Sequence, residues 1–81
     1  MAEKMNRERQ IKILKKLHRL QIKHIGVKTM WVETDRDDLS VELIIIEEDE
    51  KKTARYYFYE FYGDERIEEE FAKLDKYLKG H

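Results

Sequence analysis

The chain has 81 residues, with 17 lysines and arginines against 18 aspartates and glutamates, and it contains neither cysteine nor proline. This length supports one domain with a single core. The lack of cysteine excludes disulfides, thiolate zinc sites and cysteine nucleophiles. No apolar run precedes the first charges, and the uncharged apolar run 43–46 is far too short to cross a bilayer. We therefore expect a single-domain cytoplasmic protein (1–81). Its abundant glutamate and lysine, few amide side chains and lack of cysteine give it a thermophile-like composition.

Charge is distributed unevenly along the chain. Residues 1–30 carry nine bases against two acids, a net charge of +7, whereas residues 31–54 carry three bases against nine acids, a net charge of −6. Residues 55–81 carry five bases and seven acids and contribute −2. The folded molecule is therefore expected to have one basic and one acidic surface.

The first predicted element is a helix over residues 3–25. Apolar side chains recur at the spacing of one helix face at Ile13, Leu14, Leu17 and Leu20. A second apolar stripe to one side of this face comprises Ile11, His18, Ile22 and Ile25. Gly26 follows at a position where glycine commonly ends a helix. The two stripes together form a face that is wider than one packing contact needs.

Three strands and a second helix follow the first helix. β-forming residues predict strands over 27–34, 39–47 and 53–62. The last element is an amphipathic helix over 65–79, with Asp64 as its N-cap and Gly80 at its end. The expected fold class is thus α+β, in the order α-β-β-β-α, with a three-stranded antiparallel meander flanked by two helices.

Both faces of the predicted sheet carry apolar side chains. In the second strand, Ile44 and Ile46 lie opposite the face that holds Leu43. Either set of alternating aromatic residues in the third strand can share the face of Leu43, because a one-residue change of register exchanges the two sets. If both helices cover one face, the other stays open, and such patches usually mark interfaces; one helix on each face would remove the patch. We expect a homo-oligomer, most simply a dimer, with an interface that comprises Ile44, Ile46, Tyr56 and Phe58.

A line of cations follows the first helix. At about 100° per residue, four of them fall within a band of about 60° that is roughly 16 Å long. These four are Lys12, Lys16, Arg19 and Lys23, and the band is bordered by Arg9 and Lys15. No acid interrupts the sequence between Glu8 and Glu33. Such a band is suited to a phosphate backbone, although lysine-rich helix faces are also common as plain solvated surfaces.

Other chemistry finds less support in the sequence. The aromatic third strand offers a platform for stacking bases, but core packing explains it better, as it does Trp31, and Glu42 and Glu60 repel phosphates. The element order is also that of the double-stranded-RNA-binding domain, whose second helix begins with lysines, whereas this chain has the acidic run 65–70 there. No nucleophile–base pair, metal-ligand set or cofactor motif is present, so we expect neither an enzyme nor a metal or cofactor site.

The leading hypothesis is a small nucleic-acid-binding protein. It would contact the phosphate backbone of DNA or RNA without sequence specificity, through the basic first helix. The alternative is a homo-oligomeric assembly module that uses the apolar aromatic face of the sheet. Neither a membrane nor a small-molecule substrate is expected as a partner.

Overall fold

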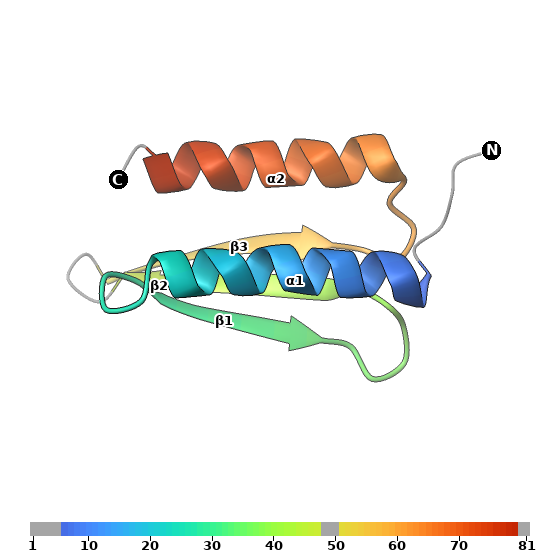
Figure 1. Cartoon of the computed structure of the whole chain (residues 1–81), viewed down its shortest axis with the longest axis horizontal. Helices are drawn as coiled ribbons and strands as arrows, with labels where there is room; N and C mark the ends of the chain where they lie inside the picture. Colours follow the sequence, from blue (N-terminus) through green and yellow to red (C-terminus); the bar gives the residue numbers. More distant parts are fainter. Residues whose placement is uncertain (1–5, 48–50, 80–81) are drawn as a thin grey trace.

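The computed structural model describes residues 6–47 and 51–79 (Figure 1). The elements in chain order are α1 (Arg7–Lys23), β1 (Thr29–Thr34), β2 (Val41–Glu47), β3 (Lys52–Phe58) and α2 (Asp64–Lys79). The strands form one antiparallel meander in the order β1-β2-β3. The predicted α+β fold class, with a helix before and a helix after the sheet, is confirmed.

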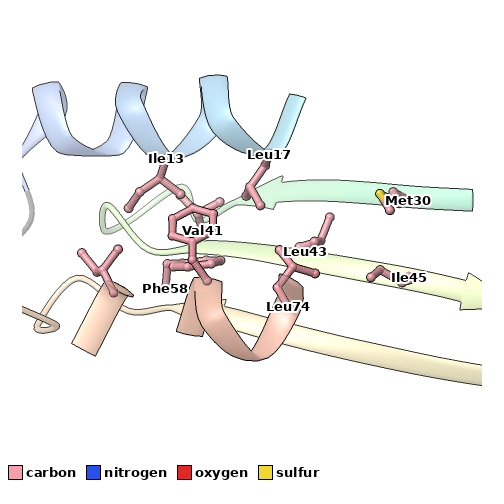
Figure 2. Packing of buried hydrophobic residues seen from close by; sticks show 10 residues of the cluster. Ile13, Leu17, Met30, Val41, Leu43, Ile45, Phe58 and Leu74 are labelled. Atoms are coloured by element: carbon pink, nitrogen blue, oxygen red, sulfur yellow. The ribbon is translucent and has the colours of Figure 1, made fainter. Parts of the chain in front are cut away.

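Both helices pack on the same face of the sheet. Ile13 and Leu17 of α1 and Leu74 of α2 meet the inner side of β2 in one core, which Figure 2 shows from close by. α1 packs on both β1 and β2, whereas α2 packs on β3. The two helices start at the same end of the sheet and run in the same direction (Figure 1). The opposite face of the sheet is therefore not covered by either helix.

The register of β2 with β3 decides which aromatic side chains enter the core. Leu43 pairs with Tyr56, and Val41 pairs with Phe58. Residues that pair directly across two strands point to the same face of the sheet. Tyr56 and Phe58 therefore face the helices, which settles the choice that the sequence left open.

At its C-terminal end, α1 stops two residues before the boundary predicted for the helix 3–25. Asn6 caps its start, because its side-chain Oδ1 accepts a hydrogen bond from the backbone N–H of Arg9 (2.8 Å). The helix ends at Lys23, and His24 is its C-cap. Gly26 then adopts a left-handed conformation (φ 80°) that lets the chain turn toward β1. Residues 3–5 lie outside the described residues, as does the predicted cap Gly80.

β3 ends four residues before the predicted boundary at 62. The backbone N–H of Glu60 donates to Ser40 Oγ (2.9 Å), and the N–H of Tyr62 donates to the carbonyl oxygen of Tyr59 (2.9 Å). These bonds form a turn that leads the chain out of the sheet and into α2. β1 and β2 each begin two residues later than predicted, at Thr29 and Val41. α2 begins at Asp64, which therefore lies in its first turn and is not its cap.

Candidate nucleic-acid interface

The predicted phosphate-binding cations lie mainly on the solvent side of α1. Gln10, Ile13 and Leu17 are the buried residues of this helix, so the side about 180° away points outward. Five cations are exposed on the outward half, and we call them the cationic ridge. They are Lys12, Lys15, Lys16, Arg19 and Lys23. Their exposure is what the helical period of the sequence predicts.

The N-terminal end of this helix is partly neutralised. The guanidinium of Arg9 forms an ion pair with the carboxylate of Asp64 in the first turn of α2. Arg9 is therefore half-buried between the helices and does not join the ridge on the outward surface. Lys12 Nζ lies 4.0 Å from Glu8 Oε1, but both side chains are mostly exposed, so this pair contributes little.

The rest of the ridge keeps its positive charge. Within 6–47 and 51–79, no carboxylate oxygen lies within 4.0 Å of the side-chain nitrogens of Lys15, Lys16, Arg19 or Lys23. Lys16 Nζ lies 4.2 Å from the centroid of the Phe71 ring, a cation–π contact that orients the side chain without neutralising it. The ridge from Lys12 to Lys23 is about 16 Å long at 1.5 Å per residue. It presents its charge on one side of one rigid element.

The sheet face opposite the helices forms a second candidate surface, which we call the open face. Trp31, Ile44 and Arg55 pair across the three strands at its centre. Ile44 is only 8% exposed although no helix covers it, whereas Trp31 is 55% exposed. Ile44 in the central strand β2 is thus covered by neighbouring side chains, whereas Trp31 in the edge strand β1 remains exposed.

Three expectations about the open face are wrong. Tyr56 and Phe58 were predicted to share an interface with Ile44 and Ile46, but they lie on the opposite, helix-covered face. Phe58 is fully buried against Phe71, with ring centroids 4.6 Å apart. Trp31 was predicted in the core and is instead exposed. The placement of Ile44 and Ile46 away from the core of the two helices is confirmed.

Aromatic rings line one end of the open face. Tyr57, Tyr59 and Phe61 form a stack with successive centroids 5.3 Å apart and planes within 5° and 8° of parallel. The sequence left open whether Tyr57 and Tyr59, or instead Tyr56 and Phe58, would be available on the sheet for stacking bases. Beside the stack lies a hollow of about 240 Å³, whose lining includes Glu33, Asp35 and Glu42. These carboxylates disfavour phosphate there, so this face is poorly suited to stacking nucleic-acid bases.

Two groups on β3 and one just after it have shifted pKa values. The hydrogen bond from Arg55 Nη1 to Glu42 Oε2 (3.1 Å) raises the pKa of Arg55. Loss of hydration raises the pKa of Tyr56, and the negative charge of Glu70 adds to this shift. Loss of hydration beside its neighbouring rings also raises the pKa of Tyr59. Arg55 is therefore charged and both phenols are protonated at neutral pH, so neither phenol is prepared to act as a general base.

The described residues show neither a metal site nor a membrane span. Across 6–47 and 51–79, no three histidine or acidic side chains gather closely enough to hold a metal ion. In the same part of the chain, neither helix is long and apolar enough to cross a bilayer. A scan against family models and searches of curated proteins and of solved structures found no match to this chain.

Proposed function

We propose that the protein binds nucleic acid through the cationic ridge of α1. The observation that carries this proposal is that Lys15, Lys16, Arg19 and Lys23 are exposed on one side of α1 with no described carboxylate within 4.0 Å. Lysine and arginine side chains in a row displace the counterions that surround a phosphate backbone. Contacts of this type fix position but do not read bases. The expected binding is therefore largely independent of sequence.

The number of contacts sets the expected dependence on salt. Four phosphate contacts give a slope of log K against log salt concentration of about −3.6 for duplex DNA and about −2.8 for single strands. Between 50 and 200 mM salt, affinity would fall by about 150-fold for a duplex and by about 50-fold for a single strand. Asp64 and Glu65 lie in the first turn of α2, so the C-terminal part of the ridge is expected to dominate.

Fluorescence anisotropy with a labelled random-sequence duplex tests the proposal. Lys15→Gln/Arg19→Gln should weaken binding at every salt concentration and reduce the slope by about 1.8. The matched control Lys73→Gln/Lys76→Gln removes two exposed cations from α2 and should leave the slope unchanged. Replacing Lys12, Lys16, Arg19 and Lys23 together by Glu should abolish binding, with the helical circular-dichroism signal retained. If this quadruple variant binds as tightly as the parent, the proposal is wrong.

A second candidate function is homo-oligomeric assembly through the open face. The observation that favours it is the exposed Trp31 beside Ile44 and Ile46 on a face that neither helix covers. An apolar assembly persists or tightens as salt rises, whereas phosphate binding weakens. Trp31→Ala/Ile46→Asp should then lower the molecular mass measured by light scattering. An unchanged mass in this variant would exclude the open face as the assembly surface.

A further inference from the structure

β1 is an edge strand with backbone groups that point out of the sheet. The backbone N–H of Asp35 donates to the carbonyl oxygen of Ser40 (3.2 Å), which makes these two a hydrogen-bonded pair. Such pairs alternate along antiparallel strands, so Thr34, Val32 and Met30 direct their N–H and C=O groups outward. Consistent with this, the carbonyl oxygen of Met30 accepts a hydrogen bond from Gln21 Nε2 (2.9 Å). Val32 and Thr34 have no such partner among the described residues.

The two edges of the sheet differ in the features that hinder pairing with another strand. At the β3 edge, Glu70 of α2 accepts a hydrogen bond from the backbone N–H of Tyr57 (3.0 Å) and so occupies one outward-facing group of the strand. β1 pairs with β2 in unbroken register, without a bulge, and its sequence TMWVET contains no proline or lysine. Proline, lysine and bulges are the usual means of blocking an edge. Apart from the bond of Gln21 to the Met30 carbonyl, β1 carries none of these blocking features and keeps the outward groups of Val32 and Thr34 for pairing.

An apolar flank of α1 lies beside this edge. The flank that faces α2 carries Arg9 and Lys16, and the second apolar stripe of α1 lies on the opposite side. Ile11 is 43% exposed and Ile22 is 56% exposed on that side, and Ile25 just beyond the helix is 79% exposed. A groove of about 300 Å³ joins the flank to β1, and its lining includes His18, Ile22 and Met30. The strand edge and the flank thus form one continuous surface.

We propose that two copies of the chain pair antiparallel through their β1 edges and form a six-stranded sheet. A two-fold axis at Val32 pairs Val32 with its own copy and Met30 with Thr34, so every outward-facing residue of β1 is used. The Met30 carbonyl oxygen, which already accepts from Gln21, accepts the new bond with its second lone pair. An axis at Glu33 would place two carboxylates opposite each other, which is unfavourable. An axis at Trp31 would leave Thr34 without a partner in the strand. The axis at Val32 is therefore the best register.

The position of α1 fits this dimer. Because α1 packs on both β1 and β2, its axis lies between them, and a strand spacing of about 4.8 Å places it about 5 Å from the two-fold axis. The two copies of α1 would lie about 10 Å apart, which is the packing distance of helices. Gln21 is level with Met30, so Val32 is level with the step from Lys16 to Leu17, about four and a half residues earlier in the helix. Ile11 of each copy then lies opposite Ile22 of the other.

The occupant is a second copy because the surface is complementary to itself. The paired strands oppose no like charges, and the apolar flanks meet each other along their lengths. Ile11, Ile22 and Ile25 together leave the equivalent of nearly two isoleucine side chains in water in each copy. With the strand edges, their burial brings the interface to about 1,000 Å², the size at which specific contacts begin. This inference does not depend on nucleic-acid binding.

Single-cysteine cross-linking tests the register, since the chain has no cysteine of its own. In Val32→Cys, the two Cα atoms would lie about 5.5 Å apart, within the range of a disulfide. Mild oxidation should therefore give a covalent dimer on a non-reducing gel. The matched control Thr34→Cys lies on the same face of the same strand, but its two copies would be about 13 Å apart and should not cross-link. Efficient cross-linking of Thr34→Cys with none of Val32→Cys would overturn the proposed register.

Sedimentation equilibrium tests the interface without a cross-link. The parent should be a dimer, and Ile22→Glu should raise its dissociation constant by at least about tenfold, because each dimer contains two such positions. Ile22 is exposed in the single chain, so its replacement should leave the folding transition unchanged. The control Ile46→Asp on the open face should remain dimeric. A monomeric parent, or a dimer that dissociates with Ile46→Asp and not with Ile22→Glu, would contradict the proposal.

Discussion

Glu70 is a charged residue at a buried position of α2, since only 7% of its surface is exposed. Its carboxylate accepts hydrogen bonds from the backbone N–H of Tyr57 (3.0 Å) and from Arg66 Nη1 (3.2 Å). In Glu70→Ala, the N–H of Tyr57 would lose its partner at the edge of β3. Leaving a buried donor unsatisfied costs about 1–3 kcal/mol. The partly exposed Arg66 adds little, because water replaces its lost partner.

We therefore expect Glu70→Ala to lower the free energy of unfolding by about 2 kcal/mol, which reduces Tm by roughly 8–16 °C in a domain of this size. Glu70→Gln keeps an oxygen that can accept the bond from Tyr57 and should cost about 1 kcal/mol. The matched control is Glu69→Ala, since Glu69 is exposed and lies 3.8 Å from the same Arg66. It should change the free energy by less than about 0.5 kcal/mol.

Urea unfolding followed by circular dichroism measures all three variants. The order of unfolding midpoints should be Glu70→Ala below Glu70→Gln below the parent, with Glu69→Ala close to the parent. Loss of the Glu70 carboxylate should also leave the N–H of Tyr57 unpaired at the β3 edge, so Glu70→Ala should aggregate more readily on heating. If Glu70→Ala and Glu69→Ala unfold at the same urea concentration, the hydrogen bond to Tyr57 does not stabilise the fold as argued.

Further predictions concern the core, a buried ion pair and alkaline pH. Phe58→Ala removes a fully buried ring and should cost about 3–5 kcal/mol in urea unfolding; a cost below about 1 kcal/mol would show that the ring is not part of the core. Lys28 and Glu47 form an ion pair between side chains that are about nine-tenths buried, so Glu47→Gln should cost about 3 kcal/mol, and Lys28→Met/Glu47→Leu should recover most of this loss. A double variant no more stable than the single one would argue against the pair. The pKa of Tyr56 is raised by burial, so the folded state holds its proton longer than the unfolded state, and stability should fall as pH rises above about 10. Tyr56→Phe should reduce this fall, as measured by urea midpoints across that pH range.

The element order and the cationic ridge were predictable because both depend on local periodicity. The helical repeat alone places Lys15, Arg19 and Lys23 on the outward side of α1, and the structure confirms that they are exposed. The pairing of Arg9 with Asp64 was not predictable, because it requires the N-terminal ends of two helices, 55 positions apart in the sequence, to meet over the sheet. Periodicity carries no information about that distance.

The errors on the sheet have one physical cause. Trp31 was assigned to the core, and Tyr56 and Phe58 to the interface, without a known register for the third strand. Charge along the same strands was the better signal, since side chains alternate between faces. Glu33 shares a face with Trp31, and Arg55 lies on the face opposite Tyr56 and Phe58. A charged residue in an alternating strand marks the solvent-facing set. Glu33 could therefore have placed Trp31 on the open face, and Arg55 could have placed Tyr56 and Phe58 on the opposite one.

Salt should have opposite effects on the proposed β1-paired dimer and on the proposed nucleic-acid binding, so one protein sample can distinguish the two. In the β1-paired dimer both copies of α1 cover the same face of the sheet, so both cationic ridges lie on one side. Like charges near the two-fold axis oppose association, and salt screens them. The dimer should therefore tighten between 50 and 500 mM salt, while binding to duplex DNA weakens. A polyanion that bridges the ridges should favour the dimer, and by reciprocity the dimer should favour the polyanion. If added duplex DNA dissociates the dimer, the ridges do not act on one common surface, and at least one of the two arrangements must be given up.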